Sequence, residues 1–200
     1  MRTNGRNGTG RRMGIGKILQ LAAALGLALL AGRRAPALAG EVTEYAVKAA
    51  YLVDFAKFVT WPAKAYGDDE GAIVIGILGD DPFGPVLDGM AEGKTLDGHA
   101  LVVRRFESFD GSQTAALRRC HILFIAYSEK DRLQDILRAI KGAPVLTVSE
   151  IDRFPLKGGM IQFDQDGRRI TLDINPSPAR AAGLELSSKL LQVAKIYGSE

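Results

Sequence analysis

The chain has 200 residues, of which 46% are hydrophobic and 24% charged, a composition typical of one globular domain and unlike that of collagen, a coiled coil or a disordered chain. The net charge of +3 hides an uneven distribution, because residues 1–39 hold 7 of the 26 basic residues and no acidic one. The remaining 19 basic and 23 acidic residues give residues 40–200 a net charge of −4. An acidic domain is a poor partner for nucleic acid.

Residues 1–39 have the pattern of a secretory signal peptide. A basic stretch that ends at Lys17 precedes an apolar run over residues 18–31, and Ala37 and Ala39 supply small side chains around a cleavage point. We therefore predict an exported, periplasmic protein whose mature domain covers residues 40–200 and begins near Gly40.

Two alternatives for this segment stay open. The apolar run has 14 residues, fewer than the ~20 that a membrane-spanning helix requires, so a retained anchor is the less favoured interpretation. Arg11-Arg12 is compatible with a twin-arginine signal, although Gly14 and Gly16 follow where that signal usually turns apolar. Ordinary secretion without direct membrane insertion is the favoured prediction.

Cys120 is the only cysteine. An exported lipoprotein needs a cysteine at its cleavage point, and an internal disulfide needs two, so the sequence predicts neither. Cys120 stands just before the apolar run 121–126, which favours a buried thiol at the edge of a strand over a nucleophile.

Helix and strand patterns alternate along most of the mature chain. Apolar residues recur at helical spacing over residues 42–61, and Pro62 then ends the helix. Strand and helix patterns follow in alternation, with strands predicted over 72–78, 100–106, 122–126 and 145–148 and helices over 82–91, 112–119 and 129–140. This order predicts the α/β class, with one domain, a mostly parallel sheet and helices on both faces.

The pattern changes after Phe154. Residues 160–163 and 169–174 flank the turn-rich segment 164–167, which predicts a C-terminal antiparallel hairpin at the edge of the sheet. A short helix over residues 179–182 and a last helix that begins at Ser187 or Ser188 and includes Tyr197 should follow.

The loop after the first predicted strand is a candidate ligand site, because open α/β sheets bind ligands at the carboxyl ends of their strands. Its candidate residues are Gly79, Asp80, Asp81 and Phe83. The loop lacks the glycine spacing of a phosphate cradle, and its two aspartates lie where an anion would sit, so nucleotide binding is improbable. Two adjacent carboxylates are also a weak cation site, and a helix cap before Pro82 explains them better.

No catalytic or metal-binding pattern is evident. His99 and His121 have no metal-ligand spacing and are predicted to be structural. The sequence contains no G-x-S-x-G elbow and no S-x-x-K motif, and its dispersed acids offer no recognisable carboxylate pair. We therefore predict a protein that is not an enzyme and has no metal and no cofactor.

The first predicted helix is apolar on two sides. One side has the pattern of an ordinary core face, and the other carries an aromatic stripe made of Val47, Tyr51, Phe55, Phe58 and, just beyond the helix, Trp61. In one interpretation the helix is buried on both sides between the sheet and another element. In the other the stripe is an interface for a partner protein or a second copy, since aromatic anchors dominate such contacts.

Several short motifs follow one another in a fixed order along the mature chain. They are Val47-Lys48-Ala49-Ala50-Tyr51-Leu52, Phe55-Ala56-Lys57-Phe58-Val59, Trp61-Pro62, the segment 77–84, Cys120-His121-Ile122-Leu123-Phe124-Ile125, Leu146-Thr147-Val148-Ser149, Gly158-Gly159-Met160-Ile161, Ile174-Asn175, Ala182-Gly183-Leu184 and Ser187-Ser188-Lys189-Leu190-Leu191. Each motif is weak alone, but their order and spacing together resemble the YfiR family of periplasmic proteins.

The resemblance implies an α/β protein that forms a homodimer and acts without catalysis. It further implies a negative regulator that binds the periplasmic part of an inner-membrane sensor protein, with a diguanylate cyclase as the expected target. Disulfides occur among relatives, whereas Cys120 has no partner here.

Two functional hypotheses follow. The first is a periplasmic regulator that represses a membrane-anchored signalling protein and thereby controls cyclic di-GMP. The second is a small-ligand binding domain that feeds a membrane sensor or receptor, or a weakly marked enzyme, using the crevice around residues 79–83. Solvent-exposed Tyr51, Phe55 and Phe58 would favour the first hypothesis, and a deep pocket near Asp80 would favour the second.

Overall fold

The computed structural model describes residues 37–66 and 71–198, with side chains placed from Glu44 onward. The chain divides into two compact units, Met1–Glu41 and Val42–Glu200. The predicted signal features of residues 1–36 lie outside the described residues, and the second unit contains the fold.

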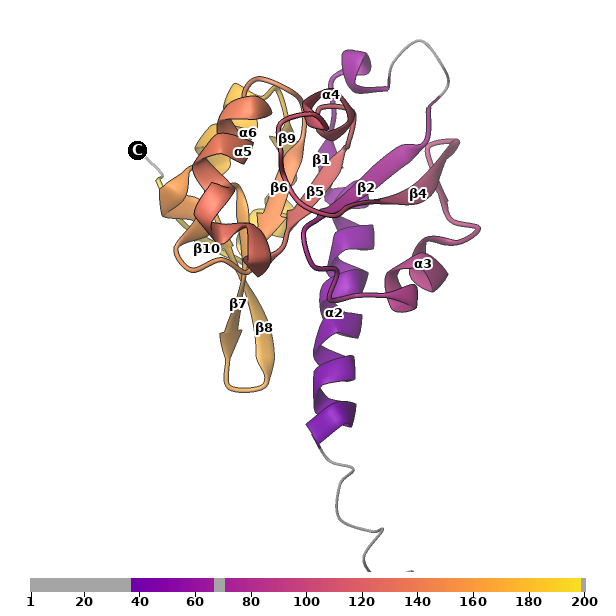
Figure 1. Cartoon of the computed structure of the whole chain (residues 1–200), viewed down its shortest axis with the longest axis vertical. Coiled ribbons are helices and arrows are strands. Elements are labelled where there is room, and N and C mark those ends of the chain that lie inside the picture. The colour runs from indigo at the N-terminus through magenta and orange to yellow at the C-terminus, as the bar shows by residue number, and fades with distance from the viewer. Residues whose placement is uncertain (1–36, 67–70, 199–200) are drawn as a thin grey trace, which may run out of the picture. The chain divides into compact units, whose positions relative to one another are not determined.

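A sheet of eight strands forms the centre of this unit (Figure 1). In spatial order its strands are β10 (Lys195–Ile196), β8 (Arg169–Ile174), β7 (Ile161–Asp166), β6 (Leu146–Ser149), β5 (Ile122–Ile125), β2 (Ile73–Leu78), β4 (His99–Phe106) and β3 (Thr95–Leu96). Neighbours pair in parallel except in the pairs β7–β8 and β3–β4. The predicted fold class, a mostly parallel sheet with a C-terminal antiparallel hairpin, is confirmed.

Helices cover both faces of the sheet. They are α2 (Ala37–Phe58), α3 (Pro85–Ala91), α4 (Thr114–Leu117), α5 (Leu133–Ala139), α6 (Pro176–Ala181) and α7 (Ser188–Gln192), with 3-10 turns η1 (Ala63–Ala65), η2 (Tyr127–Arg132) and η3 (Phe154–Lys157). Two separate apolar clusters result, one between the sheet and α2 and the other between the sheet and α4 and α5.

Strand β2 divides its side chains between these two clusters. Ile73, Ile75 and Ile77 contribute to the α2 side, and Val74 and Leu78 contribute to the α4–α5 side. Side chains alternate along a strand, so a strand covered on both faces must be apolar at nearly every position. All six residues of β2 are buried, as the continuous apolar run predicts.

An aromatic chain fixes α2 on the sheet. Phe55 of α2 stacks on Phe163 of β7 with ring centroids 6.0 Å apart and planes 18° apart. Phe163 in turn lies 6.4 Å from Phe124 of β5, which meets Phe83 edge-on at 4.8 Å. Aromatic pairs in these geometries add about 0.5–1.5 kcal/mol each beyond the area they bury.

The C-terminal end of α2 differs from the prediction. The helix ends at Phe58, not at residue 61, because Val59 and Thr60 form strand β1 and pair antiparallel with β9 (Glu185–Leu186). Two β-branched residues before Trp61-Pro62 favour an extended conformation. The pairing partner lies more than 120 positions away, so local spacing could not reveal this strand.

The last predicted helix is also shorter than expected. The side chain of Ser187 accepts a hydrogen bond from the Leu190 N–H and caps α7, which ends at Gln192. Residues 195–196 then form β10, a parallel edge strand beside β8. The predicted N-terminal cap is correct, and the predicted continuation through Tyr197 is wrong.

Strand β2 approaches the segment after α4 so closely that only glycine fits at position 76. A Cβ at Gly76 would lie 2.7 Å from Cys120 Sγ and 3.1 Å from Leu123 Cδ1. We predict that Gly76→Ala lowers the free energy of unfolding by about 1–3 kcal/mol, because overpacking forces neighbours off their rotamers. Denaturant unfolding measures this loss.

The matched control for this substitution is Gly89→Ala in α3, where an added Cβ meets nothing within 4 Å. That change should leave stability equal or slightly higher. Adding Cys120→Ala to Gly76→Ala removes the clashing sulfur and should recover part of the loss. Equal stability of Gly76→Ala and wild type would contradict the close approach.

Candidate functional site

The loop after β2 lies at the topological switch point of the sheet, because β4 and β5 flank β2 on opposite sides. Gly79 has a φ of +91°, and a Cβ there would overlap Ser128 Oγ. Ser128 Oγ also accepts a hydrogen bond of 2.9 Å from the Asp80 N–H. The chain's own β5–α5 connection therefore packs against this loop, and the Asp80 side chain remains exposed.

The other predicted ligand residues in this loop are engaged within the fold. Asp81 accepts a hydrogen bond from the Phe83 N–H at 2.8 Å and one from Arg105 Nε at 2.7 Å. Phe83 is buried and belongs to the core. Helix α3 begins at Pro85 with Gly84 as its N-cap, so the expected capping by the aspartates is wrong. Asp81 instead stabilises the turn before the helix.

Arg105 of β4 clamps this turn to α3. Its guanidinium donates to both carboxylate oxygens of Asp88, at 2.9 and 2.7 Å, and to the Gly84 carbonyl at 2.9 Å. Hydrogen bonds from Arg105 lower the pKa of Asp88, and those bonds raise the pKa of Arg105. The clamp gives Asp81 and Asp88 a structural role.

A depression lies where α2 passes the carboxyl end of β6 and the outer part of β7. It has a volume of about 300 Å³, and we call it the polar hollow. Its lining side chains come from four segments and are mostly polar, namely Glu44, Tyr45, Lys48, Tyr127, Glu150, Asp152, Gln162, Phe163, Asp164 and Gln165.

Lys48 is the buried centre of the polar hollow, with 5% of its surface exposed. Its ammonium lies 2.6 Å from Glu44 Oε1, one helical turn earlier, and 2.7 Å from Glu150 Oε2, after β6. Tyr45 OH donates to the other Glu150 oxygen at 3.3 Å. Two carboxylates thus surround one buried cation and fix α2 to the end of the parallel sheet.

The electrostatics of the hollow exclude a reactive amine. Burial alone would lower the pKa of Lys48, but hydrogen bonds to Glu150 and Glu44 outweigh burial and raise it. Lys48 therefore stays protonated and is a poor nucleophile. Burial, followed by the negative charge of Glu150, raises the pKa of Tyr45. With Asp152 and Asp164 also in the lining, negative charge exceeds positive charge, which suits a cationic group of a ligand or partner.

The residues of the aromatic stripe predicted on α2 differ in burial. Phe55 is 1% exposed and Trp61 5% exposed, so neither is available on the free surface. Val47 is 41% exposed, and Tyr51 and Phe58 are partly buried against the core. Phe55 lies under β7, and Trp61 Nε1 donates to the His121 carbonyl at 3.2 Å. Burial between elements thus explains two of the five residues, and Val47, Tyr51 and Phe58 remain as surface candidates.

One local pattern in the sequence indicates the polar hollow. Glu44 and Lys48 are spaced for an i,i+4 ion pair, and Lys48 lies between apolar residues. No local signal could identify Glu150 as the second partner, because it lies 102 positions away.

The two histidines and the cysteine have structural environments. Desolvation raises the pKa of Cys120 to about 12 and keeps it a thiol, which confirms the expected buried group. His121 is buried, and its Nδ1 accepts a hydrogen bond from the Val74 N–H at 3.2 Å. His99 Nδ1 lies 2.8 Å from the Gly71 carbonyl. Across residues 44–66 and 71–198, no cluster of three metal-ligating side chains occurs.

A family model described as YfiR/HmsC-like matches residues 45–195. The chain belongs to the YfiR/HmsC-like family. At the level of the family, membership supports a periplasmic, regulatory role.

One solved structure is similar to part of the chain. It is a conserved domain protein from Vibrio cholerae O1 biovar El Tor str. N16961, with 12% identity and a TM-score of 0.46. The match covers 62% of this chain and 54% of that one, so it spans about half the length of the Vibrio protein. Among the helices of the described part of the chain, none has the length and apolar character needed to cross a membrane.

Lys48→Met should destabilise the protein, because it leaves Glu44 and Glu150 facing each other without a cation. We expect a loss of about 2 kcal/mol in the free energy of unfolding, below the cost of breaking a fully buried pair because both carboxylates are partly exposed. Lys57→Met on the same helix is the matched control, since Lys57 and its partner Asp54 are about half exposed. Equal losses for the two variants would contradict the structural role of Lys48.

His121 should make stability depend on pH. Burial lowers its pKa to about 4, whereas an unfolded histidine has a pKa of about 6.5. Between these values the unfolded state binds one more proton, so stability falls as pH falls from 6.5 to 4. His121→Asn keeps an acceptor for the Val74 N–H and should reduce this dependence by about one proton, measured by denaturant unfolding across the range.

The control for the pH series is His99→Gln, which retains His121. That variant should keep most of the wild-type pH dependence, because burial, ahead of the charge of His99, is the main cause of the lowered pKa of His121. A series in which His121→Asn loses stability with falling pH as steeply as wild type would show that other groups cause the dependence.

Proposed function

We propose that this protein is exported to the periplasm and binds the periplasmic part of a membrane-anchored signalling protein, which it holds in its inactive state. The proposed partner is a diguanylate cyclase, so the output under control is cyclic di-GMP. Membership of the YfiR/HmsC-like family supports the regulatory role. The observation that carries the choice of surface is the exposed region where α2 borders the polar hollow.

This region, the α2–β7 surface, consists of Val47, Tyr51 and the rim of the polar hollow at Glu44, Asp164 and Gln165. Tyr51 packs against both Phe55 and Phe163, with centroid distances of 6.0 Å. These rings therefore hold the partly exposed Tyr51 side chain in one conformation. A preorganised surface loses less side-chain entropy when it binds.

Charge and polarity suggest the chemistry of the partner surface. Val47 is 41% exposed and offers an apolar contact beside the hollow. Asp152, Asp164 and Gln165 are exposed at the hollow and have oxygens free to accept hydrogen bonds from Lys or Arg. An apolar segment with a neighbouring basic residue therefore complements the α2–β7 surface.

Repression then follows from occupancy. A bound protein shifts its partner only by the difference between its affinities for the inactive and active states. Each tenfold preference for the inactive state is worth about 1.4 kcal/mol. A homodimer is a further proposal from the family resemblance. Symmetric pairing through the α2–β7 surface would bring acidic residues together, so we assign that surface to the membrane partner.

The test combines deletion with surface variants. Deletion should raise cellular cyclic di-GMP, and re-expression of the exported form should reverse the rise. Val47→Asp and Asp164→Lys should each fail to reverse it and should lose co-purification with the cyclase, because they place charges against the complementary surface. Thermal melts should stay within a few degrees of wild type, since both side chains are exposed.

Val193→Asp is the matched control, because Val193 is 70% exposed and lies outside the α2–β7 surface. It should restore repression fully. A form without residues 1–39 should not restore repression, and its success would contradict export. Unchanged cyclic di-GMP after deletion, or full repression by Val47→Asp, would overturn the proposal. Light scattering on the same variants shows whether this surface joins two copies instead.

A further inference from the structure

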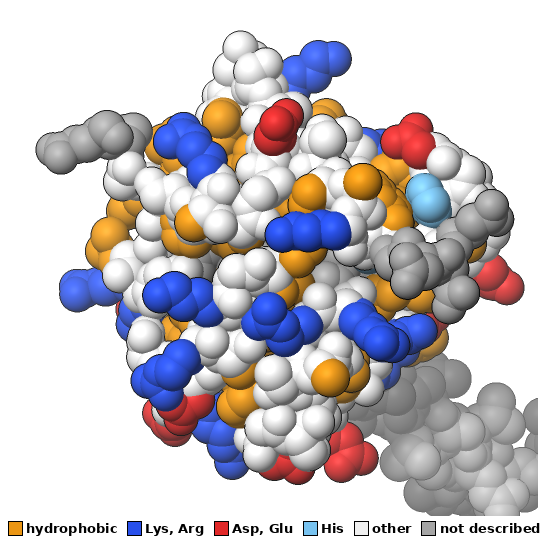
Figure 2. Space-filling model, turned by 90° about the horizontal axis from the view of Figure 1, so that it is seen from above, with side chains coloured by type: hydrophobic (Ala, Val, Ile, Leu, Met, Phe, Trp, Pro, Cys, Tyr) orange, Lys and Arg blue, Asp and Glu red, His pale blue; other side chains and the backbone are white. Residues whose placement is uncertain are grey.

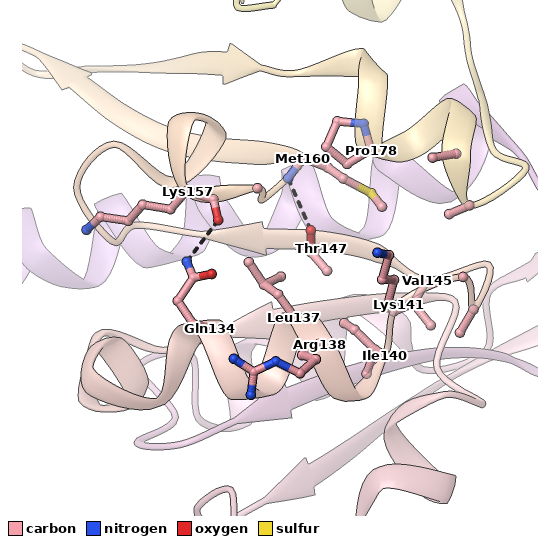
Figure 3. A pocket seen from close by; sticks show the side chains of 15 residues that line it. Gln134, Leu137, Arg138, Ile140, Lys141, Val145, Thr147, Lys157, Met160 and Pro178 are labelled. Atoms are coloured by element: carbon pink, nitrogen blue, oxygen red, sulfur yellow. Dashed lines mark hydrogen bonds between the residues drawn. The ribbon is translucent and has the colours of Figure 1, made fainter.

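A groove of about 510 Å³ lies between α5 and α6 (Figure 3). Its apolar lining includes Leu137, Ile140, Val145 and Met160. All three charged residues in its lining are basic, namely Arg138, Lys141 and Lys157. The groove thus combines an apolar interior with a rim of one charge sign.

The groove stays open because the side of α6 that borders it has small side chains. Ala181 and Ala182 line the groove opposite α5, beside Pro178. Two polar side chains of the lining are already paired. Thr147 is 2% exposed, and its hydroxyl accepts a hydrogen bond from the Met160 N–H at 3.1 Å. Gln134 Nε2 donates to the Lys157 carbonyl at 3.0 Å. An apolar group can therefore enter the groove without leaving these donors and acceptors unpaired.

The positive charge at the rim is only partly neutralised. Arg138 forms an ion pair with Asp135 at 2.7 Å. Lys141 and Lys157 form no ion pair with any carboxylate of the described residues, and Figure 3 places Lys157 on the Gln134 side and Lys141 on the Val145 side. Elements α4, α5 and α6 lie in the upper part of Figure 1, and the view from that side shows Lys and Arg gathered among hydrophobic patches (Figure 2).

We propose that the groove binds a small organic anion that has an apolar body and one carboxylate, sulfonate or phosphate group. The volume lies within the range of about 300–1,000 Å³ that is typical of small-molecule sites. Lys141 would contact the anionic group, and the apolar body would lie on Leu137, Val145 and Met160. The proposal does not depend on the partner assigned to the α2–β7 surface, which is built from other residues.

The test uses the purified protein with the anionic probe 8-anilinonaphthalene-1-sulfonate and its neutral analogue N-phenyl-1-naphthylamine. We expect saturable binding of one sulfonate probe per chain and weaker binding of the neutral probe. Decanoate should displace the sulfonate probe better than 1-decanol does.

Lys141→Gln should weaken sulfonate binding about three- to fivefold, the effect of one partly exposed ion pair. Ala181→Trp should fill the groove and abolish binding.

Ala115→Trp on α4 is the matched control, because Ala115 is exposed on another helix. It should bind the probe as wild type does, and thermal melts confirm that each variant is folded. Equal affinity for the two probes, or binding unaffected by both Lys141→Gln and Ala181→Trp, would overturn the proposal. A change of oligomeric state in Ala181→Trp would show that the groove is a contact between copies. Displacement of the probe by decanoate but not by inorganic phosphate would indicate a site for an amphiphile, and displacement by phosphate would indicate a site for a free anion.

Discussion

The apolar character of α2 on two sides is the constraint on which the rest of the structure depends. Both apolar sides of such a helix have to be buried, and the sheet buries one of them through Phe163 and Phe124. Once Phe55 is stacked there, Tyr45 meets Phe83 edge-on at 5.8 Å and fixes the loop after β2. The same placement buries the Lys48 side chain, so two carboxylates have to neutralise its positive charge. The polar hollow is thus a result of core packing.

Much of the fold was predictable because its strongest signals are local. The runs that became β2 and β5 are apolar throughout, as a strand buried on both faces requires, and their short length favours a strand over a helix. The failures have one cause, which is pairing between distant segments. Val59-Thr60 and Lys195-Ile196 are too short to show a period, and each becomes a strand only because another segment lies beside it.

The candidate site was less predictable for a related reason. Sequence position placed the loop after β2 correctly at the switch point of the sheet, but it could not show that Ser128 and Arg105 would occupy the loop's polar groups. The aromatic stripe was correct as a pattern on one helix. Which of its members stay exposed depends on β7, and no property of α2 alone distinguishes Val47 from Phe55.

The single cysteine can serve as a probe of local opening in the core of the protein. Cys120 is buried against Gly76, and its thiol has a pKa of about 12, so the folded state contains almost no thiolate to react. Oxidants and alkylating reagents can modify it only when the segment after α4 separates from β2. The rate of modification therefore measures how often this part of the core opens. Because Cys120 is the only cysteine of the chain, modification of the purified protein reports that frequency without interference from a second thiol.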